Sequence, residues 1–245
     1  MNGGRERPGK VALVVGGSGG IGEAVCQRFS RDGWQVVTAS RNPPADEAAQ
    51  DWMPIDITDH ARCADVAERI AARFGALDAL VNCASVAVPG LSGPFHRTDP
   101  AMFDLGARTS IVATFNLVHA MHRLLAMRGG AVALFASDAA LFASRNQSIV
   151  GPTRAAIVNF TRNYAMEAAE DGIRLNCISL SYVRGTPIFD ALEHEGSPRI
   201  ATATARAKLG LPQAGDIAPL VAFLCSDGAR HITGQTISVN GGLSA

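Results

Sequence analysis

Short apolar runs alternate along the chain with longer segments in which apolar residues recur every three or four positions. The first run, Val11–Val15, is apolar at five consecutive positions, which is typical of a strand buried on both faces. Further strands are expected at residues 35–39, 52–56, 77–82, 131–136, 172–179 and 233–239, and helices at residues 23–31, 61–74, 103–127, 155–169 and 215–226. This alternation predicts an α/β fold of the Rossmann type, a doubly wound parallel sheet of about seven strands with helices on both faces.

The pattern continues along the chain without an internal repeat or linker. With 245 residues, the chain is long enough for one α/β domain with a large core. Residues 1–9 are polar and glycine-rich and lack the apolar stretch of a signal peptide. We therefore expect a flexible N-terminal tail at residues 1–9 and a single dinucleotide-binding domain at residues 10–245.

Charge and cysteine content narrow the class of partner. The 22 basic and 22 acidic residues and a pI near 7.0 favour neither nucleic acid nor a membrane surface as a partner. No apolar run approaches the roughly 20 residues that span a bilayer. The five cysteines are odd in number and lack paired spacing, so we expect reduced, mostly buried thiols in a cytoplasmic protein, and no metal site.

Several glycines separate the first strand from the first helix. They are Gly16, Gly17, Gly19, Gly20 and Gly22. Glycine tolerates positive φ and lets the backbone approach a ligand closely, and the N-terminus of a helix attracts a phosphate group. A strand, a glycine turn and a helix in this order predict a dinucleotide site, with a plain structural turn as the alternative.

The spacing of three of these glycines, G-x-x-x-G-x-G at Gly16, Gly20 and Gly22, resembles the short-chain dehydrogenase/reductase family. Val15 stands where that family usually has a Thr. Other segments that resemble the family follow in order: Asp56-Ile57-Thr58-Asp59, Asn82-Cys83-Ala84-Ser85, Asn159-Phe160-Thr161-Arg162 and Val239-Asn240-Gly241-Gly242. Cys83 and Ser85 depart from the family's Asn and Gly. The resemblance covers residues 10–245 and implies hydride transfer between NAD(P)(H) and a small-molecule substrate.

The resemblance also implies which residues bind the cofactor. Arg41 stands where the family chooses between the two nucleotides, and a guanidinium suits the 2′-phosphate of NADP(H) rather than NAD(H); a solvated loop arginine is the alternative. Asp56 is expected beside the adenine, whereas Asp59 suits a helix N-cap as well as a ligand role. The full set of expected cofactor-binding residues is Gly16, Ser18, Gly20, Ile21, Gly22, Arg41, Asp56, Ile57, Asn82, Ala84, Arg154 and Thr186.

The family's proton donor is missing from this chain. Ser137 ends the fifth strand, where the family has a substrate-orienting Ser, followed thirteen residues later by a Tyr and then by a Lys four residues after that. The corresponding positions here hold Val150 and Arg154. No shift of register supplies a tyrosine, because the chain contains only Tyr164 and Tyr182. The resemblance therefore predicts a divergent member without the catalytic Tyr and Lys, in which Arg154 still meets ribose hydroxyls.

Three functions are compatible with this combination. We favour an NADP(H)-dependent oxidoreductase for a carbonyl or alcohol substrate with a substitute proton donor. Tyr182 is the first candidate donor, followed by Ser110 through a water and by His194 in a variable lid at residues 187–207; a packing, helical or solvated role is the alternative for each. Ser137, Arg154, Ser110 and Tyr182 thus form the expected catalytic set. The second function is a cofactor-binding oligomer partner or regulator without turnover, and the third is a non-redox enzyme that reuses the pocket.

The resemblance implies an assembly as well. In the family, helices corresponding to residues 103–127 and 151–169 lie on one side of the sheet and pair across a two-fold axis. Their apolar residues, including Phe160, exceed what the sheet alone would bury. We expect a homodimer or homotetramer, with a hetero-oligomer as the alternative.

Overall fold

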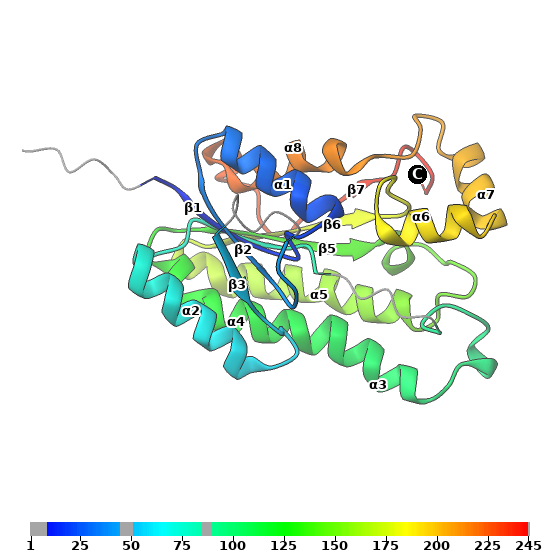
Figure 1. Ribbon diagram of the computed structural model, residues 1–245, viewed down its shortest axis with the longest axis horizontal. Helices are drawn as coiled ribbons and strands as arrows, with labels where there is room; N and C mark the ends of the chain where they lie inside the picture. The colour runs from blue at the N-terminus through cyan, green and yellow to red at the C-terminus, as the bar shows by residue number, and fades with distance from the viewer. Residues whose placement is uncertain (1–8, 45–50, 85–89, 245) are drawn as a thin grey trace, which may run out of the picture.

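The computed structural model describes residues 9–44, 51–84 and 90–244. In these ranges a seven-stranded sheet runs in the order β3-β2-β1-β4-β5-β6-β7, and every neighbouring pair of strands is parallel (Figure 1). The strands are β1 (Val11–Val15), β2 (Gln35–Ser40), β3 (Asp51–Pro54), β4 (Ala79–Asn82), β5 (Ala131–Ser137), β6 (Arg174–Leu180) and β7 (Thr236–Val239). The strand order reverses between β1 and β4, as in a doubly wound Rossmann-type fold, so the predicted fold is confirmed.

Helices cover both faces of the sheet, as Figure 1 shows. One face carries α1 (Gly20–Arg31) and α8 (Ala214–Cys225), and the other carries α2 (His60–Phe74), α4 (Ala113–Ala126) and α5 (Val150–Ala168). In β1, Leu13 and Val15 join the core under α2, α4 and α5, whereas Ala12 and Val14 join the core under α1 and α8. Both faces of the strand are therefore buried, which explains its unbroken apolar sequence.

Two shorter helices, α6 (Pro187–His194) and α7 (Pro198–Arg206), lie beyond the carboxyl ends of β5 and β6 (Figure 1). They occupy the region expected to form a lid. A small apolar cluster, which we call the lid cluster, holds them together and consists of Phe189, Ala203, Ala207 and Leu211. Within the described ranges, no helix combines the length and the apolar character needed to cross a membrane.

The structure differs from several predicted boundaries; for example, α5 begins at Val150 rather than at residue 155, and β7 begins at Thr236 rather than at residue 233. The sequence predicts one helix over residues 103–127, but the structure has α3 (Ala101–Ala107), a π-helical turn at Arg108–Val112 and then α4. The hydroxyl of Thr114 donates to the carbonyl of Ser110 at 2.8 Å, a bond that competes with regular helix geometry at this turn. The third strand ends at Pro54 rather than at residue 56, although the backbone nitrogen of Ile55 still donates to the carbonyl of Ser40 at 3.1 Å.

Candidate functional site

The candidate residues gather where β1, β4, β5 and β6 end. In the parallel ladders Val15 lies beside Asn82, and Ser137 lies beside Leu180. The glycine turn follows β1, and the segment containing Thr186 follows β6. Segments far apart in the sequence thus meet outside the carboxyl ends of the strands, where open α/β sheets bind their ligands.

The turn after β1 leaves no room for side chains at two of its glycines. Gly16 has φ +78°, and a Cβ atom there would lie 2.8 Å from the backbone nitrogen of Ala84. A Cβ atom at Gly22 would overlap the carbonyl oxygen of Gly16. On the other side of the turn, a Cβ atom at Gly20 would lie 3.4 Å from Cγ2 of Thr186. The turn is therefore held between the segment after β4 and the segment after β6.

The N-terminus of α1 has the features of an anion site. Gly19 is its N-cap residue, and none of the described side chains caps the helix there. Ser18 is exposed at this turn, and Ile21 is partly exposed. Uncapped backbone N–H groups and the helix dipole favour a phosphate at such a position. The bare cradle at Gly16 and Gly22 and this helix end together fit the pyrophosphate of a dinucleotide.

Arg41 and Asp56 follow β2 and β3 at the same edge. The Asp56 carboxylate accepts hydrogen bonds through Oδ1 from the backbone nitrogen of Thr58 at 2.9 Å and from its hydroxyl at 2.8 Å. These bonds are the main reason why the pKa of Asp56 is lowered, and the positive charge of Arg41 adds to the effect. Asp59 instead caps α2, accepting from the backbone nitrogen of Ala61 at 2.9 Å. Arg41 itself is exposed and accessible to a ligand.

Two amide side chains fix the backbone of this edge. Asn82 is buried, and its Oδ1 accepts from the backbone nitrogen of Ala84 at 3.2 Å. Asn116 of α4 donates from Nδ2 to the carbonyl of Ile57 at 3.1 Å, which ties the segment after β3 to α4. The sequence analysis missed Asn116, because an amide inside a helix belongs to no motif. Ser85, which stands in place of the family's Gly, lies outside the described residues.

Ser110 lies in the π-helical turn, which contacts α5. Ser110 is buried. A Cβ atom at Gly106, in the preceding helical turn, would lie 2.8 Å from Cγ2 of Ile149, the residue before α5. This stretch of helix therefore packs closely against the helix that carries Val150. Turns of the π type are frequent at functional sites, but no glycine or proline within residues 107–115 signals this one.

A buried carboxylate follows Ser137 at the end of β5. The Oγ atom of Ser137 accepts from the backbone nitrogen of Ala139 at 3.3 Å. Asp138 is buried, and its two oxygens accept from the hydroxyl of Ser179 and from the amide of Asn240, each at 2.7 Å. These bonds join β5, β6 and the segment after β7 beneath Ser137. The sequence analysis missed Asp138; an acid directly after an apolar strand was the available signal.

Helix α5 begins at Val150, and Arg154 lies one turn further along. A Cβ atom at Gly151 would lie 2.9 Å from the carbonyl oxygen of Ala139, so the helix start packs tightly against the segment after Ser137. Val150 has no group that could donate a proton. Arg154 is partly buried, and desolvation lowers the pKa of its guanidinium. Its guanidinium makes no hydrogen bond or ion pair within the part of the chain that the structure describes.

The three candidates after β6 lie apart from one another. Thr186 lies against the glycine turn and caps α6, its hydroxyl accepting from the backbone nitrogen of Phe189 at 3.4 Å. Tyr182 packs against the lid cluster. His194 is the exposed last residue of α6. Of these residues, the structure brings Thr186 to the glycine turn, whereas Tyr182 contacts the lid helices and His194 faces solvent.

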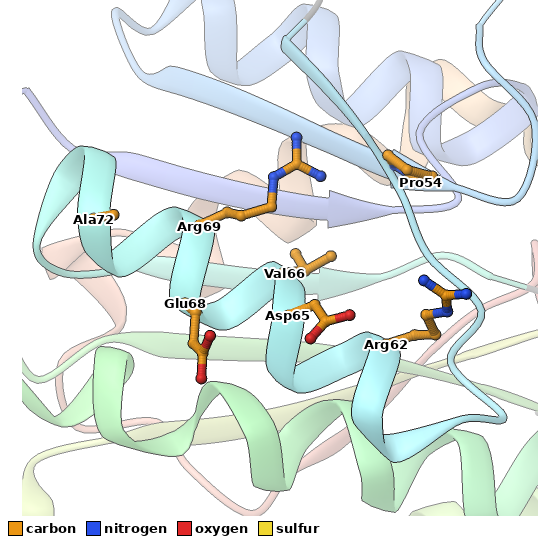
Figure 2. A pocket seen from close by; sticks show the side chains of 7 residues that line it. All are labelled: Pro54, Arg62, Asp65, Val66, Glu68, Arg69 and Ala72. Carbon is orange, nitrogen blue, oxygen red and sulfur yellow. The ribbon is translucent and has the colours of Figure 1, made fainter.

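The hollow drawn in Figure 2 lies on α2, away from the glycine turn. Its lining residues are Pro54, Arg62, Asp65, Val66, Glu68, Arg69 and Ala72. The two arginines and two acids balance in charge, and this lining includes none of the residues expected to bind the cofactor. This hollow therefore does not coincide with the predicted nucleotide site at the carboxyl edge of the sheet.

Known proteins resemble the chain along nearly its whole length. A family model described as Enoyl-(Acyl carrier protein) reductase matches residues 16–244. A tropinone reductase homolog of Arabidopsis thaliana is 32% identical over 249 residues, which cover 96% of this chain and 92% of the relative. The chain belongs to the short-chain dehydrogenase/reductase family. It is therefore an oxidoreductase of that family, and the resemblance based on the glycine spacing is confirmed at this level.

Solved structures of the short-chain dehydrogenase/reductase family superpose closely on the chain. A short-chain type dehydrogenase/reductase from Mycobacterium ulcerans has a TM-score of 0.87 and 26% identity, covering 96% of this chain and 89% of that one. ElxO with NADP bound also has a TM-score of 0.87, at 23% identity, and covers 96% of this chain and 99% of its own. At 23% identity, the similarity to ElxO supports the fold alone.

Proposed function

We propose that the chain is an NADP(H)-dependent oxidoreductase that interconverts a carbonyl group and an alcohol on a small-molecule substrate. The observation that carries the proposal is the glycine cradle at the uncapped N-terminus of α1, flanked by Ala84 and Thr186. The exposed guanidinium of Arg41 suits a 2′-phosphate. The fold neighbour ElxO was solved with NADP bound, which supports the same choice of nucleotide.

In this proposal, different residues at the carboxyl edge bind different parts of the nucleotide. The backbone at Gly16–Gly22 holds the pyrophosphate, Arg41 holds the 2′-phosphate, and Asp56 with Ile57 meets the adenine. The nicotinamide end lies near Asn82, Ala84 and Thr186. The carboxyl ends of neighbouring strands position all of these residues. When bound, the nucleotide supplies or accepts the hydride.

Ser137 orients the carbonyl oxygen of the substrate. In the reducing direction, the carbonyl carbon accepts a hydride with its two electrons, the carbonyl oxygen accepts a proton, and NADP⁺ leaves as the oxidised product. We propose that Val150 and Arg154 stand in the places of the family's Tyr and Lys. The proton must then come from another group, because Val150 has none to give. Losing a general acid costs about 10²–10⁴ in rate, so turnover is expected to be slow rather than absent.

Ser110, acting through a water, is the donor that we propose first. It is buried in the π-helical turn that packs against the start of α5. Tyr182, the first candidate from the sequence, packs against the lid cluster, and His194 is exposed at the end of α6. Ser110→Ala should therefore lower turnover more than Tyr182→Phe, and the reverse order would return the role to Tyr182.

Turnover is tested by mixing the purified chain with NADPH and following its oxidation against a panel of ketones. Slow oxidation with at least one ketone is the expected result. Saturable NADPH binding without oxidation by any ketone would select a cofactor-binding partner or regulator without turnover. Conversion of a substrate without any change in the nucleotide would select the non-redox function.

We propose that α4 and α5 pair with a second copy in a homodimer or homotetramer. The rings of Phe115 and Phe160 lie 4.7 Å apart, and Phe160 stacks on Tyr164 at 5.2 Å. Phe115 is 42% exposed, so this aromatic cluster lies partly open on the helix faces. Exposed aromatic clusters are typical of protein interfaces. Light scattering at micromolar concentration should give a dimer or tetramer, and Phe160→Glu should shift it toward monomer; a native monomer would refute the pairing.

We further propose a cytoplasmic location. All five cysteines are free, and four of them are buried, as expected of thiols in a reducing compartment. Fractionation of cells that produce the chain would test this location, and recovery outside the cytoplasm would contradict it.

A further inference from the structure

Two histidines face each other across the contact between α2 and α4. His60 is the first residue of α2, and His119 lies in the middle of α4. Their ring centroids are 5.0 Å apart, and Nε2 of His60 lies 3.0 Å from Nδ1 of His119. Both residues are exposed, and neither belongs to the expected nucleotide or catalytic set. The two imidazoles therefore form a side-chain cluster that the function proposed above does not use.

Other contacts between the same two helices keep this pair together. Asn116, one turn before His119 on α4, donates from Nδ2 to the carbonyl of Ile57 at 3.1 Å, and Ile57 lies three residues before His60. Both helices also contribute side chains to one buried core, and they lie side by side in Figure 1. The backbone positions that carry the two rings are therefore fixed independently of the contact between the rings.

The distance between the two ring nitrogens suits two ligands of one transition-metal ion. Zinc binds an imidazole nitrogen at about 2.0–2.1 Å, so neighbouring ligand nitrogens lie about 2.9 Å apart at a right angle and about 3.3 Å apart in a tetrahedron. The observed 3.0 Å lies between these two separations. Because both side chains are exposed, their rings can rotate to point both nitrogens at an ion beside the line that joins them.

The proton between the two rings can leave their contact without leaving the histidines. A neutral imidazole has one N–H group and one lone pair, and the contact as a hydrogen bond places an N–H on one of the facing nitrogens. Moving this proton to the outer nitrogen of the same ring leaves two lone pairs facing each other. In the described parts of the chain, no hydrogen bond holds the outer nitrogens, Nδ1 of His60 and Nε2 of His119, in one tautomer.

The donor atoms determine which ions suit the pair. Imidazole suits zinc, copper and nickel, whereas magnesium and calcium take oxygen ligands. Within residues 9–44, 51–84 and 90–244, no three His, Cys, Asp or Glu side chains converge on one metal position, so water must complete the coordination. Two ligands, where a structural zinc site has four, provide roughly half of its binding free energy, which corresponds to a dissociation constant of about 1–100 μM.

We propose that His60 and His119 form a two-histidine site for a divalent transition-metal ion such as Zn²⁺, Ni²⁺ or Cu²⁺. The bound ion clamps α2 to α4 and replaces one hydrogen bond by two metal–nitrogen bonds. The site does not depend on the proposed oxidoreductase function. The sequence predicts no metal site, because these histidines lie 59 residues apart and belong to no ligand motif.

The test titrates the untagged chain, treated with EDTA and then desalted, with ZnCl₂, NiCl₂ and CuCl₂ in an isothermal titration calorimeter. At least one of these metals should bind at one ion per chain with a dissociation constant of about 100 μM or tighter. MgCl₂, the control, should give no saturable binding. Weaker binding or none by all three metals would overturn the inference, and so would one ion per two chains, which would place the site between copies.

Two single variants attribute the binding to the pair. His60→Gln and His119→Gln each remove one ligand at an exposed position, so each should weaken metal binding by about tenfold or more. His231→Gln is the matched control, because it removes an exposed histidine elsewhere and should leave the affinity unchanged. Circular dichroism checks the fold of each variant. Native affinity in either folded variant of the pair would overturn the assignment.

The proposed clamp adds a second readout on the native chain. A metal that binds only the folded state stabilises it, so saturating ZnCl₂ or NiCl₂ should raise the midpoint of thermal unfolding of the native chain. The same addition should leave the midpoint of His60→Gln nearly unchanged. An equal rise in both proteins would mean that the ion acts elsewhere, and it would contradict the clamp between α2 and α4.

Discussion

The carboxyl edge of the sheet has two halves: a nucleotide half at the glycine turn after β1, and a catalytic half at Ser137 and the start of α5. They differ in what determines their ligand specificity. In the nucleotide half, Gly16 and Gly22 stand where any Cβ atom would meet backbone, so the site is defined by the shape of the main chain. In the catalytic half, Ser137 ends β5 as expected, but α5 begins with Val150, and Arg154 has no partner in the described chain. In the function proposed above, nucleotide binding thus depends on many backbone contacts, whereas the chemistry depends on a few side chains. One or two substitutions can therefore change the chemistry and leave nucleotide binding in place.

The largest effect is expected from placing a tyrosine and a lysine at the two positions where we propose that the family's Tyr and Lys are replaced. Val150→Tyr combined with Arg154→Lys should raise the ketone reduction rate at saturating substrate by about 10²–10⁴. The matched control is Val150→Phe with Arg154→Lys, which differs by one hydroxyl and should give no such rise. Val150→Tyr alone should do less, since Arg154 is bulkier than Lys beside the new phenol. If the double variant binds NADPH and gains nothing over its control, the catalytic half has been remodelled beyond its acid.

A smaller effect is expected when the backbone of the nucleotide half is crowded. Gly22→Ala places a Cβ atom on the carbonyl oxygen of Gly16, and overpacking of this kind costs about 1–3 kcal/mol. The free energy of unfolding in urea should fall by that amount, and NADPH binding should weaken. Gly19→Ala is the matched control, because a Cβ atom there meets no other atom within 4 Å. Equal losses in the two variants would contradict the tight packing of this turn.

The same contrast between halves explains what the sequence could predict. Strand β1 and the glycine turn are visible in the sequence, because double-sided burial gives an apolar run and close backbone contact demands glycine. The partners of Asp138 could not be foreseen, since Ser179 and Asn240 lie 41 and 102 residues away along the chain. The π-helical turn could not be foreseen either, because residues 107–115 contain no glycine or proline that would signal it. Long-range contacts, and not local preferences, set the bonds of Asp138.

The preference for NADPH over NADH tests the role of Arg41 in the nucleotide half. Arg41→Asp should weaken NADPH binding by about 10- to 100-fold, because a charge-assisted bond to the 2′-phosphate is lost and an acid suits the free ribose hydroxyls of NADH. Fluorescence titration of both nucleotides measures the change. Arg69→Asp, on the hollow of Figure 2, is a control of equal charge change and should leave both affinities nearly unaltered. An unchanged order of affinities in Arg41→Asp would make Arg41 a solvated loop residue.

The smallest effect is expected on the stability of the fold at acidic pH, through Asp56 in the nucleotide half. The pKa of Asp56 is lowered in the folded chain, so its carboxylate stabilises the fold above the ordinary pKa of about 3.9 and loses this contribution as the pH falls through the lowered value. Asp56→Asn should therefore be slightly less stable than the native chain at pH 7, and the gap should close in acid. Urea unfolding from pH 7 to pH 3 measures it. A gap that widens on acidification would contradict the cause given for the shift.

The most direct test of the central claim is a fluorescence titration of the purified, unmodified chain with NADPH and with NADH. We predict saturable binding of both nucleotides, with NADPH bound about tenfold or more tightly through Arg41. Equal affinities would remove the proposed role of Arg41. Absence of saturable binding by either nucleotide would contradict the claim that the glycine cradle and the N-terminus of α1 form a working dinucleotide site.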